Sequence, residues 1–195
     1  MKSAKVVKEP YVSNSEMAER CVQIAQRIAE DAHAGAVRRG SGLPYKVHPE
    51  RMANRIPRSK KLGMLTVLKS SAWLHDVIED TGYTANSLFA RLVADGYPAK
   101  YAKWVVEIVN DLTKYPGIPW DAARISKPAK YLKLLDRIDN LQDGARFFGP
   151  KWLRKYLDES RELAKKLQGT DYSLETELRN LMDQLEEYLR KQEKK

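Results

Sequence analysis

The chain has 195 residues, of which 43% are hydrophobic and 31% are charged, and its 35 Lys and Arg against 26 Asp and Glu give a net charge of +9. This length allows one domain with a hydrophobic core, and no apolar run approaches the roughly 20 residues that span a bilayer. Cys21 is the only cysteine, which excludes an intrachain disulfide and a cysteine-based zinc site. The N-terminal lysines are not followed by an apolar segment, so we predict no signal peptide and expect a cytoplasmic protein without a membrane partner.

The excess of positive charge favours anionic partners, such as nucleotides or nucleic acid. Lys and Arg are spread along the chain, and the sequence has no RNA-recognition signature and no block of basic residues with interleaved aromatic residues. Nucleic-acid binding is therefore an alternative and not the leading interpretation. The sequence makes no prediction about the oligomeric state.

Helical periodicity begins in residues 17–32, where apolar side chains recur on one face. Ser13 and Glu16 have the spacing of a capping box at the start of this helix, and residues 1–14 are predicted to be an N-terminal extension. Cys21 lies on the apolar face, so we interpret it as a core residue and not as a nucleophile.

Later segments continue the helical pattern. Residues 98–112 and 174–189 each carry an apolar stripe, and Ser173 is the predicted N-cap of the second of these helices. Segments with Gly or Pro predict loops at residues 38–45, 81–84, 114–119 and 147–150. The lysine-rich residues 191–195 are expected to fray. Because no segment alternates like a strand, the sequence predicts an all-α protein, with residues 1–195 forming a single helical bundle.

The segment AWLHDVIEDT, residues 72–81, places four ionisable side chains directly after apolar ones: His75, Asp76, Glu79 and Asp80. The simplest interpretation is a helix end that passes from the core into solvent, which explains Glu79 and Asp80. It does not explain the adjacent His75 and Asp76, whose imidazole nitrogen and carboxylate oxygen both suit divalent metal ions. Two ligands do not form a site, so this pair alone is weak evidence.

Two other segments contain residues that could complete a metal site. His48 lies in PYKVHPE, at the expected start of a helix. Asp136 and Asn140 share one face of a predicted core helix in KLLDRIDNLQD, residues 133–143. Taken alone, Asp136 is explained by an ion pair with a neighbouring basic residue. Two histidines and two aspartates from three helices together make a site for a hard or borderline metal ion with open positions for water.

The segments RRGSGLPYKVHP, WLHDVIEDT and KLLDRIDNLQD occur in this order and at about the separations found in the HD-type hydrolase domain of the Rel/SpoT stringent-response proteins, which they resemble. The resemblance is greater to the stand-alone small alarmone hydrolases, the metazoan SpoT-homologue type, because the connection before KLLD is short and because AKKLQGTDYSLETELRNL is similar to their C-terminal helix pair. It extends from about residue 17 to residue 190. The sequence has no room for the synthetase domain of the long Rel proteins, so the resemblance implies hydrolysis alone.

The resemblance implies a single HD-type metal-dependent phosphohydrolase domain that binds Mn²⁺. The implied ligands are the two histidines and two aspartates already singled out: His48, His75, Asp76 and Asp136. Glu79 and Asp80 lie one turn beyond the ligand pair, where they are placed to hold a water molecule and accept its proton.

The implied substrate is guanosine tetra- or pentaphosphate, cleaved at the 3′ phosphorus to pyrophosphate and GDP or GTP. Such a polyanion requires cationic side chains near the metal. Arg39, together with Arg38, lies in a glycine-rich loop before His48 and can donate a fork of hydrogen bonds to phosphate oxygens. Asn140 shares the face of Asp136 and can hydrogen-bond the ribose or a phosphate.

The chain departs from the family pattern at two places. Gly40 follows Arg39 where a second basic residue is common, and Asp139 stands where His or Tyr is usual. Both departures bear on the details of substrate recognition more than on metal binding. Two alternatives within the enzyme class therefore stay open: removal of the 2′-phosphate of NADPH, and hydrolysis of another nucleotide such as a (d)NTP or a nucleoside monophosphate. A basic helical protein that binds nucleic acid is the alternative outside the class.

Overall fold

The computed structural model describes residues 15–193, and over this range the chain forms nine α-helices and no β-strand. The all-α prediction is confirmed. Ser13, half of the predicted capping box, lies outside the described residues. The helices are α1 (Ser15–Ala32), α2 (Val47–Arg55), α3 (Leu62–Leu74), α4 (Val77–Asp80), α5 (Ala85–Ala94), α6 (Ala99–Leu112), α7 (Lys127–Phe147), α8 (Pro150–Leu167) and α9 (Tyr172–Glu193).

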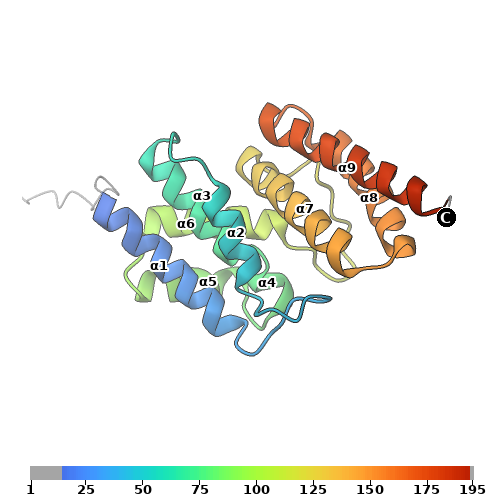
Figure 1. Ribbon diagram of the computed structural model, residues 1–195. Coiled ribbons are helices and arrows are strands. Elements are labelled where there is room, and N and C mark those ends of the chain that lie inside the picture. The colour runs from blue at the N-terminus through green and yellow to red at the C-terminus, as the bar shows by residue number, and fades with distance from the viewer. Residues whose placement is uncertain (1–14, 194–195) are drawn as a thin grey trace, which may run out of the picture.

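The helices form two groups that meet at α2 and α7 (Figure 1). In the first group, α1 and α6 pack on α3, and α5 packs on α6. In the second group, α7, α8 and α9 pack on one another. Helix α2 contacts both α3 and α7, and α6 also reaches α7, so that residues far apart in the sequence meet where the two groups join.

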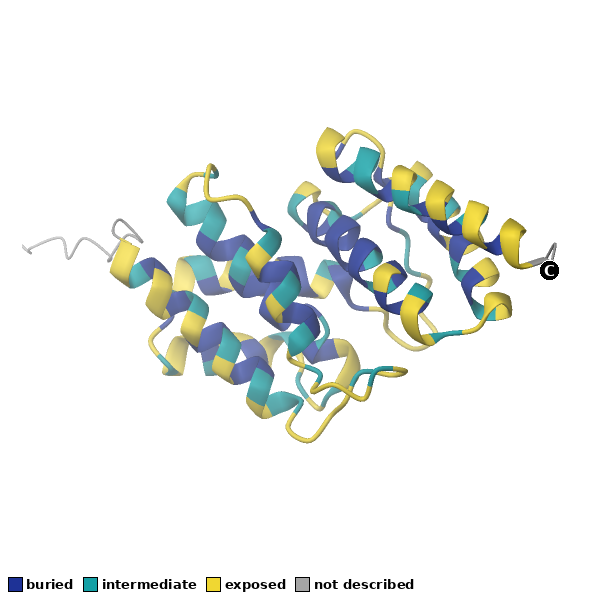
Figure 2. Ribbon diagram, in the orientation of Figure 1, coloured by how far each residue is buried: buried dark blue, intermediate teal, exposed yellow. Residues whose placement is uncertain are grey.

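Most of the apolar faces predicted from periodicity pack, although Trp104 on α6 and Tyr188 on α9 are exposed at the edges of their stripes. On α1, Cys21, Ile24 and Ile28 are at most 1% exposed. Helix α3 is buried along most of its length, as expected of a helix that is apolar nearly all round. Figure 2 shows buried residues on the helices of both groups, including α7, and many exposed residues along α9 and in the loops. Each fully buried Leu or Ile side chain contributes about 1.5–3 kcal/mol to the stability of the fold.

Helix α7 carries both core and polar residues inside the molecule. It begins where the Ser126 hydroxyl accepts a hydrogen bond from the N–H of Ala129, with Pro128 in the first turn. Its leucines and Ile138 are fully buried, as KLLDRIDNLQD predicted. Four charged side chains of this helix are also buried: Lys133, Asp136, Asp139 and Asp143.

Three local details differ from the sequence-based expectations. The helix that enters residues 72–81 ends at Leu74, and a four-residue helix, α4, follows. His75 Nδ1 contacts the carbonyl oxygen of Ala72 at 2.9 Å, so its side chain bonds the last turn of α3 at the point where the helix stops.

At the start of α9, Asp171 and not Ser173 provides the cap, because its carboxylate accepts a hydrogen bond from Leu174 N at 3.1 Å. At the other end, residues 191–193, which were expected to fray, are helical. Within residues 15–193, no helix combines the length and hydrophobicity needed to cross a membrane.

Candidate metal centre

Three separate parts of the chain bring two histidines and two aspartates together. His48 lies in the first turn of α2, His75 and Asp76 form the junction between α3 and α4, and Asp136 lies in α7. The Nε2 atoms of His48 and His75 are 3.2 Å apart. Asp136 Oδ1 is 3.3 Å from His48 Nε2 and 4.0 Å from His75 Nε2, and Asp76 Oδ2 is 3.0 Å from His75 Nε2. The ligand atoms of His48, His75 and Asp76 all lie within 4.8 Å of one another, and Asp136 approaches the same two imidazoles from α7.

Both imidazole rings are held by their Nδ1 atoms, on the side away from this cluster. His75 Nδ1 lies 2.9 Å from the carbonyl oxygen of Ala72, and His48 Nδ1 lies 2.6 Å from Asp139 Oδ2. Carbonyl and carboxylate oxygens accept hydrogen bonds, so each Nδ1–H donates and each Nε2 is the atom free to bind an ion. Both rings are almost fully buried, which fixes these orientations.

The two carboxylates are held as anions by different partners. Lys133, itself buried, donates to Asp136 Oδ2 at 2.7 Å. Burial acts against the charge of Asp136, but Lys133 and the nearby His48 hold its pKa well below the usual range. Burial also acts against the charge of Asp76, but the adjacent His75 lowers the pKa of its carboxyl, which in addition accepts a hydrogen bond from the hydroxyl of Tyr45.

The negative charge of this cluster suits a cation. Burial acts to lower the pKa of His75, but the carboxylates of Asp76 and Asp136 outweigh burial and raise it to about 9. A field that attracts a proton to His75 also attracts a divalent metal ion. Two imidazole nitrogens and two carboxylate oxygens are a donor set that first-row transition ions accept, so the residues fit a metal centre.

Glu79 and Asp80 follow the ligand pair at the end of α4 and are exposed. Partial burial and the charges of Asp76 and Glu79 raise the pKa of the Asp80 carboxyl. Glu79 Oε2 accepts a hydrogen bond from the backbone N–H of Lys114 at 2.9 Å, which ties α4 to the loop after α6.

The two arginines before His48 are placed differently. The guanidinium of Arg38 donates to Asn140 Oδ1 at 2.7 Å and to Asp143 Oδ2 at 3.0 Å, and its side chain is only 15% exposed. Arg39 is exposed and lies over the ring of Phe148 at 5.9 Å. The structure thus brings Arg38 to Asn140, and through Asn140 to Asp136, which accepts a hydrogen bond from the amide. It does not bring Arg39 there.

Five other side chains surround the cluster: Tyr45, Arg51, Lys133, Asp139 and Asp143. The ion pair of Asp136 with a neighbouring basic residue was expected and is made by Lys133, whereas the contact of Asp139 with His48 was not expected. A signal for two of the five side chains was present, because Asp136, Asp139 and Asp143 recur at the three- and four-residue spacing of one helix face. An acidic stripe along a core helix indicates buried partners. No comparable signal marked Arg51, and Tyr45 lies in the segment RRGSGLPYKVHP without a predicted contact to Asp76.

No protein-family model matches the chain. The chain is 30% identical over 152 residues to human guanosine-3′,5′-bis(diphosphate) 3′-pyrophosphohydrolase MESH1, over 73% of this chain and 82% of that protein. It is 27% identical to the zebrafish protein of the same name, over 72% and 79% of the two chains. Over 62 residues it is 44% identical to the bifunctional (p)ppGpp synthase/hydrolase RelA of Mycobacterium tuberculosis, over 32% of this chain and 8% of that protein.

A solved structure has a similar fold. It is described as a metazoan ortholog of SpoT that hydrolyzes ppGpp and plays a role in starvation responses. The two chains superimpose with a TM-score of 0.67, over 90% of this chain and 97% of the other, at 23% sequence identity. At this identity the likeness concerns the fold, and it extends over both groups of helices.

Proposed function

The chain belongs to the family of stand-alone guanosine-3′,5′-bis(diphosphate) 3′-pyrophosphohydrolases, and we propose that it catalyses their reaction, the hydrolysis of (p)ppGpp. Water attacks the phosphorus bonded to the ribose 3′ oxygen, the bond between that oxygen and phosphorus breaks, and pyrophosphate leaves together with GDP or GTP. The observation that carries this proposal is the convergence of two imidazoles and two carboxylates at the junction of α2, α4 and α7.

The four converging residues would hold one divalent ion, for which we propose Mn²⁺. His48 and His75 would supply Nε2, and Asp76 and Asp136 would each supply an oxygen. When bound, a divalent ion lowers the pKa of a neighbouring water and neutralises negative charge on a phosphate. Tyr45 and Lys133 would keep the two carboxylates fixed, because each donates to one of them.

Asp80 is the proposed proton acceptor. It lies one helical turn beyond Asp76, with its N–H donating to the carbonyl oxygen of Asp76 at 2.8 Å, so its carboxylate would be near a water held by the ion. Glu79, whose Oε2 is bound to Lys114 N, would fix the end of α4 and with it the direction of Asp80, while its other oxygen stays available to water.

On the opposite side of the cluster, Arg38 and Asn140 would bind the nucleotide. Arg38 donates to Asn140 and Asp143, so its guanidinium is already oriented, and little side-chain entropy is lost when its remaining N–H groups donate to a phosphate or ribose oxygen. Arg39, exposed near the same loop, would contribute long-range attraction to the polyanion.

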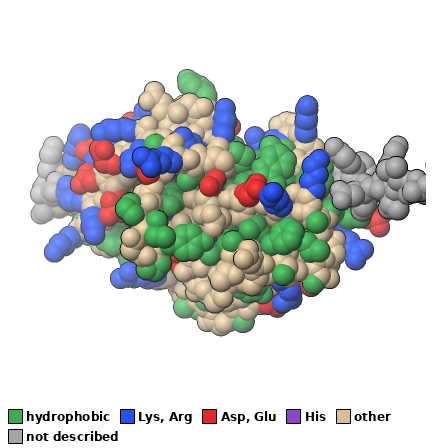
Figure 3. All heavy atoms as spheres, turned by 180° about the vertical axis from the view of Figure 1, so that it is seen from behind, with side chains coloured by type: hydrophobic (Ala, Val, Ile, Leu, Met, Phe, Trp, Pro, Cys, Tyr) green, Lys and Arg blue, Asp and Glu red, His purple; other side chains and the backbone are tan. Residues whose placement is uncertain are grey.

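The nucleic-acid alternative receives less support. On the face shown in Figure 3, Lys and Arg are scattered among acidic and hydrophobic side chains and do not form one continuous basic patch. A protein that tracks a phosphate backbone requires such a patch, and its affinity falls steeply with salt. Weak, strongly salt-dependent retention on nucleic acid, without metal-dependent hydrolysis, would favour this alternative.

The decisive experiment gives purified, Mn²⁺-loaded protein equal concentrations of ppGpp, NADPH and the dNTPs and identifies the products. We expect pyrophosphate and GDP from ppGpp at a higher kcat/KM than any phosphate release from the other substrates. The matched control is the same protein stripped with EDTA, which should be inactive until Mn²⁺ is returned. Intact ppGpp beside cleavage of NADPH or a dNTP would replace the proposed substrate and leave the metal centre in place.

A further inference from the structure

We propose that Asp139 is a positioning residue of the metal centre, whose carboxylate holds His48 in the tautomer that presents Nε2 to the ion. The inference rests on the proposed metal-dependent function. The departure at Asp139 was expected to concern the substrate, but its carboxylate contacts the proposed metal ligand His48.

The His48 ring is held between two carboxylates of the same helix. Asp136 Oδ1 lies 3.3 Å from its Nε2, and Asp139 Oδ2 lies 2.6 Å from its Nδ1. His48 is 0% exposed and Asp139 is 2% exposed, so water does not compete for either nitrogen. Because Asp136 and Asp139 are one turn apart on α7, one helix determines both sides of the ring.

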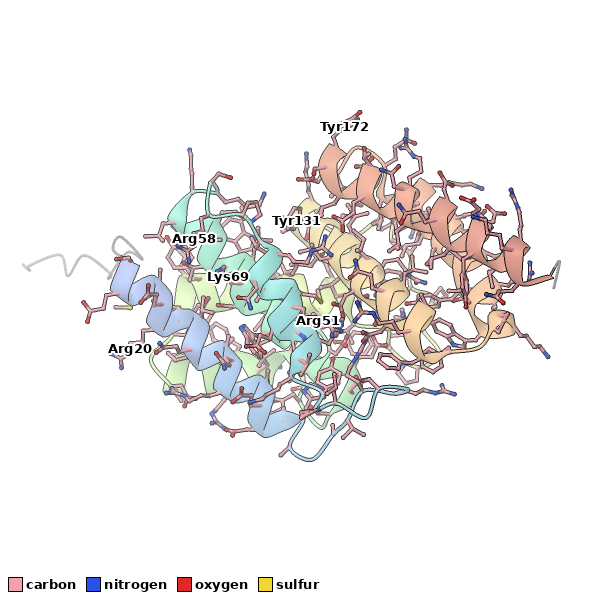
Figure 4. The ribbon with its side chains drawn as sticks, in the orientation of Figure 1. Arg20, Arg51, Arg58, Lys69, Tyr131 and Tyr172 are labelled. Carbon is pink, nitrogen blue, oxygen red and sulfur yellow. The ribbon has the colours of Figure 1, made fainter. Side chains whose placement is uncertain are left out.

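The Asp139 carboxylate is itself fixed by an arginine from the helix that carries His48. Arg51 Nε donates to Oδ1 at 2.6 Å and Arg51 Nη2 donates to Oδ2 at 2.7 Å, which is a two-point contact. Figure 4 labels Arg51 on α2, where this helix faces α7. The contact keeps Asp139 ionised and leaves Oδ2 directed at His48.

If these ion pairs served only to hold α2 against α7, Asp139 and Asp143 would have equivalent roles. Asp143, one turn further along α7, shares the same arginines: its Oδ2 lies 2.8 Å from Arg51 Nη2 and 3.0 Å from Arg38 Nη2. Among the contacts of the described residues, however, only Asp139 of these two aspartates reaches His48. Asp143 is therefore a natural control for the structural effect of the cluster.

The chemical consequence follows from the direction of the hydrogen bond. A carboxylate that accepts from Nδ1–H excludes the tautomer with its proton on Nε2, and its charge makes Nε2 a stronger donor to a cation. Loss of such an outer partner typically weakens metal binding about 10–100-fold. In Asp139→Asn, Arg51 draws the amide oxygen to itself, so the amide NH₂ faces His48 Nδ1 and forces the proton onto Nε2.

The first test measures the Mn²⁺ affinity of nucleotide-free protein from the EPR signal of the unbound ion. We expect Asp139→Asn to bind Mn²⁺ about 10–100-fold more weakly than wild type. Asp143→Asn removes the same charge from the same cluster and should retain an affinity close to wild type. An unchanged affinity in Asp139→Asn, or an equal loss in both variants, would overturn the proposal.

The second test uses wild-type protein and determines the tautomer of His48 directly. The chain has three histidines, so ¹⁵N NMR of their rings in Zn²⁺-loaded wild-type protein can resolve His48. We expect a proton on His48 Nδ1 and the metal-induced shift on Nε2, and the reverse pattern would overturn the proposal even if Asp139→Asn failed to fold. Neither test uses ppGpp. If the protein does not hydrolyse ppGpp, the measurements of Mn²⁺ affinity and of the His48 tautomer therefore still decide the proposal.

Discussion

The apolar interface between α1 and α3 and the polar junction between α2 and α7 are both deeply buried, but they are built from opposite kinds of residue. At the first, Ile24, Ile28 and Val67 are almost fully buried and carry no charge. At the second, His48, Asp136 and Asp139 are buried to nearly the same degree.

Burying charged groups opposes folding unless every charge is paired, and even then an apolar replacement is often as stable. The α2–α7 junction is therefore built at a cost in stability that the α1–α3 interface does not carry. The pairing of each buried charge, through Lys133, Arg51 and Tyr45, reduces this cost and leaves the Nε2 atoms of the histidines to bind a ligand. The polar junction serves binding, and the apolar interface supplies the stability that permits it.

The largest effect is expected from a ligand of the polar junction. Asp76→Ala should abolish Mn²⁺ binding and reduce activity to background while the fold is retained, because Asp76 is partly exposed and its removal deletes a charge from the cluster. Elemental analysis and circular dichroism measure the two outcomes. Asp95→Ala, which removes an aspartate paired with Arg91 at the end of α5, should change neither. Full metal occupancy in Asp76→Ala would remove Asp76 from the ligand set.

A smaller effect on activity is expected from Glu79 and Asp80, which lie next to the proposed ligands. Asp80→Asn should lower kcat about 10²–10⁴-fold, the range for a lost general base, with Mn²⁺ binding unchanged. Glu79→Gln should lower it less, because an amide oxygen can still accept the hydrogen bond from Lys114 N. Steady-state kinetics with ppGpp gives both values. Near-normal turnover in both variants would mean that another group accepts the proton.

Substitutions at the apolar α1–α3 interface should lower the stability of the fold and leave Mn²⁺ binding unchanged. Ile28→Ala should lower the free energy of unfolding by about 2–5 kcal/mol, because the buried side chain leaves a cavity. Urea unfolding measures this, and the Mn²⁺ affinity of the folded variant should equal that of wild type. Glu187→Ala on the exposed face of α9 should leave the urea midpoint close to that of wild type. A matching loss of metal affinity in Ile28→Ala would show that the two regions are coupled.

The smallest expected difference is in the KM for ppGpp between variants of Arg38 and Arg39, the two arginines of the loop before α2. Arg38→Ala should raise the KM for ppGpp about 10–100-fold, which corresponds to the roughly 1.5–3 kcal/mol of hydrogen bonds to a charged group. Arg39→Ala should raise it less, because its side chain is exposed and lies over Phe148. Initial rates at several ppGpp concentrations separate KM from kcat. The opposite order would mean that Arg39 leaves Phe148 when the nucleotide binds.

Much of the fold was predictable because helix faces are encoded locally. Apolar side chains at helical spacing predicted α1, α6 and α9 and identified α7 as a core helix. Gly and Pro predicted the loops between them. The same local signals missed the break between α3 and α4, where His75 Nδ1 contacts the carbonyl oxygen of Ala72 at 2.9 Å.

The sequence by itself determined the all-α class, the apolar faces and, through its motifs, the four residues proposed to bind metal. Only the tertiary structure decided which side chains surround them. His48 meets Asp139 across 91 residues, and Arg38 meets Asn140 across 102. Such pairs depend on how α2 and the loop before it dock on α7. Local periodicity specifies which face of a helix is buried, but the partner of each buried polar group is determined by the packing of helices that are distant in the chain.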